Sequence, residues 1–526
     1  MKQLWYGGTI YTMEKENETV EAVLVENDKI IAVGTFAELS NLADEKIDLR
    51  GAAMYPGFVD SHLHMIFQGE KLIRLDLSKA GSAEEMLNMI KEAAKTTPPN
   101  KWLFGEGWNE NNFADGRIPT KQELDEIRKE PILLTRVCHH VVLGNTAAFE
   151  AGGIHEESKA PAGGEIGRTP EGKLNGLLYD QAMNRVTNAI PRVGEGYIQD
   201  LVHVLNLCID DMLSKGLTGG HTEDMHYFGH YSNPLKAFLQ VIGEKHHFRV
   251  HLLRHHAVFK EMMEDPIQYD EPFVEPGAMK IFTDGALGSS TAALSKPYSD
   301  NTSNRGLLIH TDEELEELVK LARSCNEAVA VHMIGDRGAE QIITLLEKYP
   351  APIGKRDRLI HACVLREDLI ERIVKLPVVI DIQPLFVPSD FPWVMNRLGD
   401  DRLEYAYAWK TLLDKGIMCA AGTDAPVEEI NPIATIYAAV ERKKPGQKHD
   451  GYLLEQKLSR FEAIRAYTVG SAQAICKEHE RGLIKQGYDA DFSIFDRDLF
   501  KGTSEEMLEA KAVKTVVAGK IVFERN

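Results

Sequence analysis

The sequence predicts an α/β fold: a (β/α)8 TIM barrel with a small β-sandwich domain built from both termini and a β-rich insertion after the first barrel strand. Eight apolar, strand-like segments alternate with helical patterns, and most follow one another at about the 30-residue spacing of a βα unit. Short alternating β segments occupy both ends of the chain. One long gap separates the first two barrel strands, and structureless loops of that length are improbable.

The two ends of the chain show the same residue pattern. Apolar and polar residues alternate in five short segments, at 4–11, 22–26, 29–33, 491–495 and 513–523. This β-rich pattern differs from the alternating strands and helices of the middle of the chain, so we expect the two ends to meet. Residues 1–53 and 476–526 are therefore predicted to form one composite β-sandwich domain.

The middle of the chain, residues 54–475, is predicted to form the barrel. Its expected strands are 54–60, 217–222, 248–254, 277–283, 328–332, 358–361, 378–382 and 417–422. Helical periodicity lies between most of them, for example at 312–326, 339–348 and 367–375. The insertion is expected at 66–205, with strands at 101–107, 132–142, 165–168 and 174–179. We expect it to cover the mouth of the barrel.

Charge and composition exclude several classes of protein. The 526 residues carry a formal net charge of −20, which would repel nucleic acid and anionic membranes. The six cysteines are scattered without a Cys-x-x-Cys pair, as expected for reduced thiols in a cytoplasmic protein. No segment is typical of a signal peptide or a membrane span. We therefore expect a small-molecule substrate, no nucleic acid or membrane partner, and, as a general prior for soluble enzymes, a homodimer.

Metal-binding residue types follow the predicted barrel strands at their C-terminal ends, where barrel enzymes place their active sites. The first strand leads into His62 and His64, two residues apart, so both imidazoles leave one face of the chain. The other strands supply Lys280 with Asp284, His332, His361 and Asp424. Neutral imidazole is the commonest metal ligand, and this donor set suits zinc or a similar divalent ion.

Each of these residues also has an ordinary structural interpretation. His332 would serve as a hydrogen-bonded core histidine, Asp424 as a helix N-cap before Ala425 and Pro426, and Lys280 as the partner of a carboxylate. These explanations are independent of one another. Together they would have to fall by chance on the same end of one barrel, which favours a shared site.

The segment 56–64, Pro-Gly-Phe-Val-Asp-Ser-His-Leu-His, resembles the opening motif of the metal-dependent amidohydrolase superfamily. Four further segments, 105–109, 280–286, 332–336 and 383–384, make the chain similar to the YtcJ-like amidohydrolases, which include N-substituted formamide deformylases. The resemblance covers nearly the whole chain. It implies that His62, His64 and Asp424 bind one metal, His332 and His361 a second, and a carboxylated (carbamylated) Lys280 bridges them. Lys280 sits early in its predicted strand and Asp284 is nearer the end, so Asp284 is the substitute ligand or substrate contact. A single-metal site is the fallback.

This ligand set predicts hydrolysis by a metal-activated water. Zinc is the expected cofactor, as one or two ions, with manganese or iron as alternatives. Asp424 would act as general base and acid. The metal, helped by His332 or His361, would polarise the scissile carbonyl. The expected substrate is a non-peptide C–N bond in an amide, an N-substituted formamide or a cyclic amide. Ring deamination and a non-catalytic barrel are the alternatives. Trp108, His139, Asp284 and Arg337 are the predicted substrate contacts.

Overall fold

The chain forms two compact units, Met1–Gln68 with Ile198–Asn526, and Gly69–Tyr197. The structure is a computed structural model, and it describes residues 1–138, 140–161, 163–243, 245–265, 269 and 273–525. The two units correspond to the barrel with its terminal sheet and to the inserted segment.

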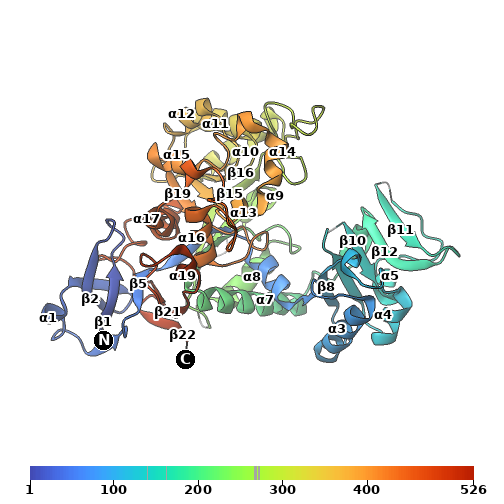
Figure 1. The fold of residues 1–526 in the computed structure, drawn as a ribbon, viewed down its shortest axis with the longest axis horizontal. Helices are drawn as coiled ribbons and strands as arrows, with labels where there is room; N and C mark the ends of the chain where they lie inside the picture. The colour runs from blue at the N-terminus through green and yellow to red at the C-terminus, as the bar shows by residue number, and fades with distance from the viewer. Residues whose placement is uncertain (139, 162, 244, 266–268, 270–272, 526) are drawn as a thin grey trace. The chain divides into compact units, whose positions relative to one another are not determined.

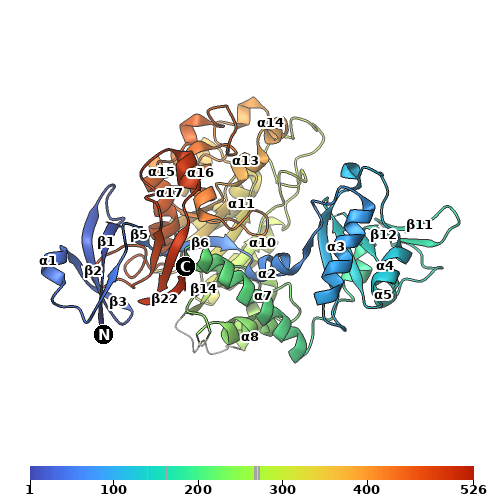
Figure 2. The ribbon, with the colours of Figure 1, turned by 60° about the horizontal axis from the view of Figure 1, so that its bottom comes forward.

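The first unit contains the predicted barrel, and the fold class is confirmed. Eight parallel strands follow one another in the order β19-β18-β17-β16-β15-β14-β13-β6. Figure 2 labels two of them, β6 and β14. Their bounds are β6 Phe58–Leu63, β13 Leu217–Thr222, β14 Arg249–His255, β15 Val274–Phe282, β16 Val329–Met333, β17 Asp357–His361, β18 Val378–Ile382 and β19 Met418–Ala421. The two end strands approach each other where the backbone N–H of Asp424 donates to the His62 carbonyl at 2.7 Å. The sheet is thereby nearly closed.

Helices fill the crossovers between the barrel strands, as parallel strands require. The helices that lie between or after these strands include α7 Glu195–Ser214, α8 Ser232–Val241, α9 His256–Glu264, α10 Asp312–Ser324, α11 Asp336–Lys348, α12 Glu367–Ile373, α15 Trp409–Asp414 and α16 Pro432–Glu441. Local sequence defines their ends: at α10, Thr311 and Glu314 form a reciprocal capping box. Every residue of β13, β17 and β18 is buried, as expected of parallel strands that are covered on both faces.

Both termini contribute to one sheet, ordered β22-β21-β20-β5-β1-β2-β3, with β4 paired to β1. In Figure 1 the N-terminal β1, β2 and β5 lie in the same region as the C-terminal β21 and β22. The strands are β1 Lys2–Tyr11, β2 Thr19–Glu26, β3 Lys29–Gly34, β4 Glu45–Asp48, β5 Ala53–Pro56, β20 Phe492–Phe495, β21 Ala512–Val517 and β22 Lys520–Glu524. Trp5 and Phe492, nearly 490 positions apart, pack edge to face in its core.

The chain passes from the terminal sheet into the barrel at Gly57. The prediction of one strand over 54–60 is wrong, because β5 pairs with β20 and β6 begins a separate sheet. Gly57 donates its N–H to the Asp491 carbonyl at 2.8 Å. A Cβ at this position would lie 2.4 Å from Thr218 Oγ1, so only glycine fits this crossing without a shift.

The second unit is a six-stranded sheet with the order β11-β12-β10-β9-β8-β7. Its strands are β7 Leu75–Asp76, β8 Leu103–Trp108, β9 Ile132–Arg136, β10 Val141–Gly144, β11 Gly164–Arg168 and β12 Leu174–Asp180, and its helices include α3 Ala83–Thr96, α4 Lys121–Ile127 and α5 Thr146–Ala151. The segment predicted as a single strand, 132–142, is the antiparallel pair β9 and β10. That this unit covers the barrel mouth stays a prediction.

Among the described residues no helix combines the length and apolar character needed to span a bilayer.

A cavity of about 30 Å³ lies between the barrel and the terminal sheet, lined by residues that include His221, His251 and Glu275. Its volume suits a water molecule and not an organic substrate.

Candidate metal centre

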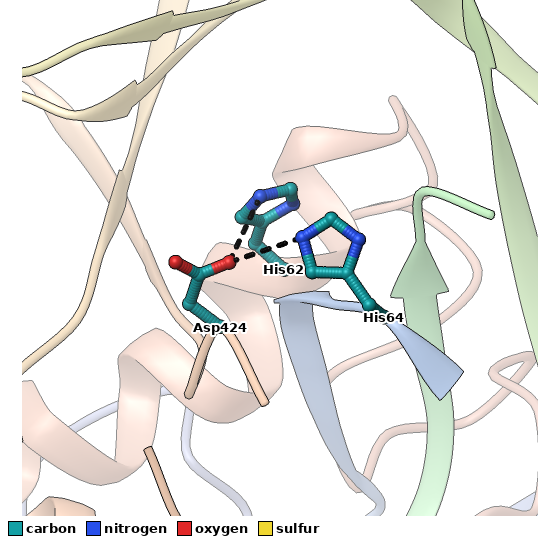
Figure 3. Close-up of side chains that lie close together, drawn as sticks. All are labelled: His62, His64 and Asp424. Carbon is teal, nitrogen blue, oxygen red and sulfur yellow. Dashed lines mark ion pairs between the residues drawn. The ribbon is translucent and has the colours of Figure 1, made fainter. Parts of the chain in front are cut away.

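His62, His64 and Asp424 meet at the junction between the first and last barrel strands (Figure 3). Asp424 Oδ1 lies 3.5 Å from Nε2 of His62 and 3.4 Å from Nε2 of His64. One ligand atom from each residue lies within 4.8 Å of the other two. Figure 3 shows both imidazole rings turned toward the Asp424 carboxylate. His62 lies in β6 and His64 directly follows it, while Asp424 lies in the loop after β19. Two imidazoles and a carboxylate are a donor set that fits zinc.

Lys280 reaches the same place from β15. Its Nζ donates to Nε2 of His62 at 3.1 Å, and only 1% of the residue is exposed. The sequence placed Lys280 early in a strand at 277–283. The strand in fact begins at Val274, so Lys280 stands two residues from its C-terminal end. The earlier start follows from the pairing of Val274 with Val250 of β14, and the end at Phe282 leaves Lys280 near the barrel mouth.

His332 and His361 stand next to this group. The ring centroids of His361 and His62 are 5.6 Å apart, and those of His332 and His361 are 4.6 Å apart. His332 lies in β16, and His361 ends β17. The structure therefore brings all six residues predicted as ligands together at one end of the barrel.

Hydrogen bonds fix which ring nitrogen of each histidine remains available. His64 Nδ1 lies 2.7 Å from the Glu223 carbonyl, and His361 Nδ1 lies 2.8 Å from Oε1 of Gln383. His332 uses Nε2 instead, 3.1 Å from the Gly285 carbonyl. In the neutral ring, an acceptor on one nitrogen sets the tautomer and leaves a lone pair on the other, as is typical of metal-binding histidines.

The backbone of the site is held in a strained conformation. Asp424 has φ of 58°, and His361 and Ala362 have φ of 77° and 47°. Such values cost energy in residues other than glycine and occur where surrounding contacts enforce them. Asp60 provides such contacts for Asp424, because its carboxylate accepts hydrogen bonds from the backbone and hydroxyl of Thr423 and from the His62 N–H.

Charges in the site shift the acid–base properties of its members. Burial alone would lower the pKa of His64, but its hydrogen bond to Asp424 and the charges of Asp424 and Glu223 raise that pKa to about 9. Burial opposes ionisation of Asp424, yet His64, His361 and Lys280 hold its pKa below the ordinary value. Asp424 is therefore a carboxylate at neutral pH.

Sequence reasoning missed two buried acids, Glu223 and Asp224, which directly follow β13. Glu223 Oε2 lies 3.8 Å from Nδ1 of His64, and Glu223 and Asp224 are each 0% exposed. Burial raises the pKa of Asp224 to about 6, opposed mainly by the charge of His64. Their position immediately after a barrel strand is the same signal that identified the other residues.

The predicted substrate contacts lie in different surroundings. Trp108 is fully buried in the core of the inserted unit and donates its indole N–H to the Leu134 carbonyl, which favours a packing role. Asp284 is also buried, and its carboxylate accepts backbone N–H groups from Ala293, Ile334 and Gly335. These bonds favour a role in holding loops together over a substrate contact. Arg337 is exposed near the start of α11, and His139 lies outside the described residues.

His255, at the end of β14, gives an expected pH dependence of stability. It is 7% exposed and stacks between His226 and His256. Burial, reinforced by these imidazoles and Lys280, lowers its pKa to about 3. The unfolded chain has an ordinary histidine pKa of about 6.5 and takes up the proton first, so stability falls as the pH drops below that value. Between pH 8 and pH 5 this group accounts for a loss of about 2 kcal/mol.

The His255→Asn variant tests this expectation. His255 Nδ1 accepts the Ala257 N–H as the N-cap of α9, and asparagine preserves that acceptor while removing the titration. Urea unfolding at pH 8 and pH 5 should show a drop in unfolding free energy that is about 2 kcal/mol smaller in the variant. Equal pH dependence in the two proteins would contradict the assignment.

The fold and this group of residues define a metal-dependent hydrolase of the barrel class. Residues 45–523 match the model of the Amidohydrolase family, and the chain belongs to that family. The resemblance drawn from the motifs is thereby confirmed. The chain is 45% identical to the YtcJ amidohydrolase of Bacillus subtilis (strain 168), over 100% of both chains.

Two other similar proteins extend this comparison. The chain is 26% identical to the N-substituted formamide deformylase of Arthrobacter pascens, covering 98% of this chain and 97% of that one. A crystal structure of an uncharacterized metal-dependent hydrolase from Pyrococcus furiosus superimposes with a TM-score of 0.81. It is 28% identical and covers 95% of this chain and 100% of its own.

Proposed function

We propose that this protein hydrolyses a non-peptide C–N bond in an amide, an N-substituted formamide or a cyclic amide. The observation that carries the proposal is the convergence of His62, His64 and Asp424, with Lys280 Nζ 3.1 Å from His62. The similarity to a formamide deformylase over nearly the whole chain supports the bond type.

The residues present suit one or two divalent cations, with zinc the best match to the donors. His62, His64 and Asp424 would hold one ion, and His332 and His361 a second. A cation bound there would supply a Lewis acid that lowers the pKa of water and polarises the scissile carbonyl.

Lys280 is suited to bridge the two positions as a carbamate, which offers two anionic oxygens where an ammonium offers none. Only the neutral amine reacts with CO₂. Burial lowers the pKa of Lys280 to about 8, against the opposing charges of Glu223 and Asp424. An appreciable fraction of the amine is therefore neutral at physiological pH.

Asp424 performs the proton transfers in this proposal. Its carboxylate is ionised, lies beside both imidazoles and would accept a proton from the attacking water. The same carboxyl group then donates that proton to the nitrogen of the leaving amine as the C–N bond breaks. The products are a carboxylic acid, which is formate for a formamide substrate, and a free amine.

A substrate screen with metal-loaded protein tests the proposal. N-substituted formamides, N-acyl amines and cyclic amides are incubated with the wild-type enzyme, and the released amine or acid is quantified. Ring deamination, the alternative within the family, would release ammonia and leave the ring intact, so ammonia is measured in parallel. We expect turnover of at least one amide class without ammonia release.

The double variant His62→Asn/His64→Asn is the matched control for this screen. It removes two imidazoles while keeping polar side chains of smaller size, so it should retain the fold and lose tight metal binding. Elemental analysis of both proteins gives the metal content independently of activity. A wild-type protein without stoichiometric metal, or activity unchanged in the double variant, would contradict the proposed function.

A further inference from the structure

A buried arginine–carboxylate pair crosses the interior of the barrel. Arg358, on β17, donates from Nε to Oδ2 of Asp381 at 2.9 Å and from Nη2 to Oδ1 at 2.7 Å. The same Nη2 also donates to the backbone carbonyl of Ser61 on β6. The two side chains are 1% and 0% exposed. One guanidinium therefore links three strands within the barrel.

Each of these strands carries a part of the candidate metal centre. Ser61 immediately precedes His62, and Arg358 lies three residues before His361 on the same strand. Asp381 lies two residues before Gln383, whose amide oxygen is 2.8 Å from Nδ1 of His361. Since β17 and β6 are not neighbours in the sheet order, backbone ladder bonds do not set their separation. The Arg358–Ser61 contact spans the barrel interior between them.

Arginine is suited to fix such a separation. Its planar guanidinium presents donors in a rigid fork, so a bidentate carboxylate on one side sets the direction of the remaining donor. A buried ion pair contributes little to stability compared with apolar packing of similar volume, because both charges lose their hydration. Its distinctive property is a defined geometry.

We infer that Arg358, held by Asp381, is a positioning residue that fixes the spacing between His62 and His361. This inference rests on the proposed function, because it assigns those histidines to a metal centre. The hydrogen bonds that the structure gives Arg358 go to Asp381 and Ser61 and not to a ligand atom of the centre. It acts through the backbone of Ser61 and through its own strand.

The double variant Arg358→Met/Asp381→Leu tests the inference, because it removes both charges and leaves neither unpaired. We expect its urea midpoint to stay close to that of the wild type and its metal dissociation constant to rise about 10- to 100-fold. Zinc affinity is measured by competition with a chromogenic chelator, and the visible spectrum of the cobalt-substituted protein reports the ligand geometry.

The matched control is Arg249→Met/Asp491→Leu. This pair is also bidentate, at 2.5 and 3.1 Å, and both side chains are 10% exposed. It joins the start of β14 to the terminal sheet and contacts none of the six candidate ligands. We expect its metal affinity to match the wild type. An equal loss of affinity in both double variants would overturn the inference, as would wild-type affinity in the Arg358/Asp381 variant.

If the Arg358/Asp381 variant does not fold, Arg358→Lys provides the decisive measurement. Lysine keeps a positive charge beside Asp381 but lacks the fork that reaches Ser61 at the same time. We expect weakened metal binding in a folded protein, and unchanged binding would overturn the inference. Failure of the proposed function is distinguishable, because it is scored on the wild-type protein, by its metal content and by the products of the substrate screen.

Discussion

Replacement of Asp424 by asparagine is expected to lower kcat by about 10²- to 10⁴-fold, the range for loss of a general acid–base group. Asparagine has nearly the same shape but cannot accept the proton of the attacking water at neutral pH. It also tolerates the left-handed backbone that Asp424 adopts, with φ of 58°. The fold should therefore persist, and the loss should appear in kcat more than in KM.

The measurement compares steady-state kinetics of the wild type and Asp424→Asn at saturating metal, with the best substrate from the screen. Metal content is determined for both proteins, so that a lost proton acceptor is separated from a lost ligand. Glu429→Gln, at an exposed acid in the same loop after β19, is the matched control and should leave kcat unchanged. Near-wild-type kcat in metal-loaded Asp424→Asn would exclude Asp424 as the proton carrier.

Replacement of Lys280 by alanine is expected to abolish measurable activity and to lower the metal content. Lys280 is 1% exposed and lies 3.1 Å from Nε2 of His62. Without it, no anionic group from β15 remains to bridge two cations. The second ion, between His332 and His361, should be lost first, because those residues have no carboxylate of their own in the proposed ligand set.

Chemical rescue distinguishes a bridging carbamate from a purely structural lysine. Alanine leaves space in which acetate or propionate can supply the two missing oxygens, so these acids should restore part of the activity and of the second metal. Lys296→Ala is the control, because Lys296 lies later in the loop after β15 and is 66% exposed. Wild-type activity in Lys280→Ala, or full metal content without rescue, would contradict the bridging role.

Most barrel strands were predictable from sequence because they alternate with helical patterns at the spacing of a βα unit. β13 and β18 coincide with the predicted 217–222 and 378–382, and burial of both faces accounts for the apolar run of β18. The two strands on either side of Gly57 could not be told apart from sequence, because β5 and β6 are both apolar and only one residue lies between them. Their division depends on pairing with β20 at the far end of the chain, which local patterns cannot reveal.

The site was predictable where residue type and position after a strand agreed. No single structural role would explain four histidines and an aspartate at the ends of barrel strands. Their shared position therefore indicated a common site, formed by His62, His64, His332, His361 and Asp424. Lys280 was found, but its register depended on ladder pairing with β14. Glu223 was not predicted as part of the site, because acids that follow strands usually face solvent. Its burial depends on tertiary packing, which the sequence does not reveal. Trp108 was overestimated because an aromatic residue in a predicted loop cannot be distinguished by sequence from one in a core.

The single glycine between β5 and β6 has a consequence for the order of biosynthesis. β5 is completed by β20, which the ribosome makes more than 400 residues later. Until β20 emerges, β5 has only its pairing with β1, and Gly57 joins β5 directly to the strand that presents His62. The terminal sheet therefore cannot be completed before nearly the whole chain has left the ribosome.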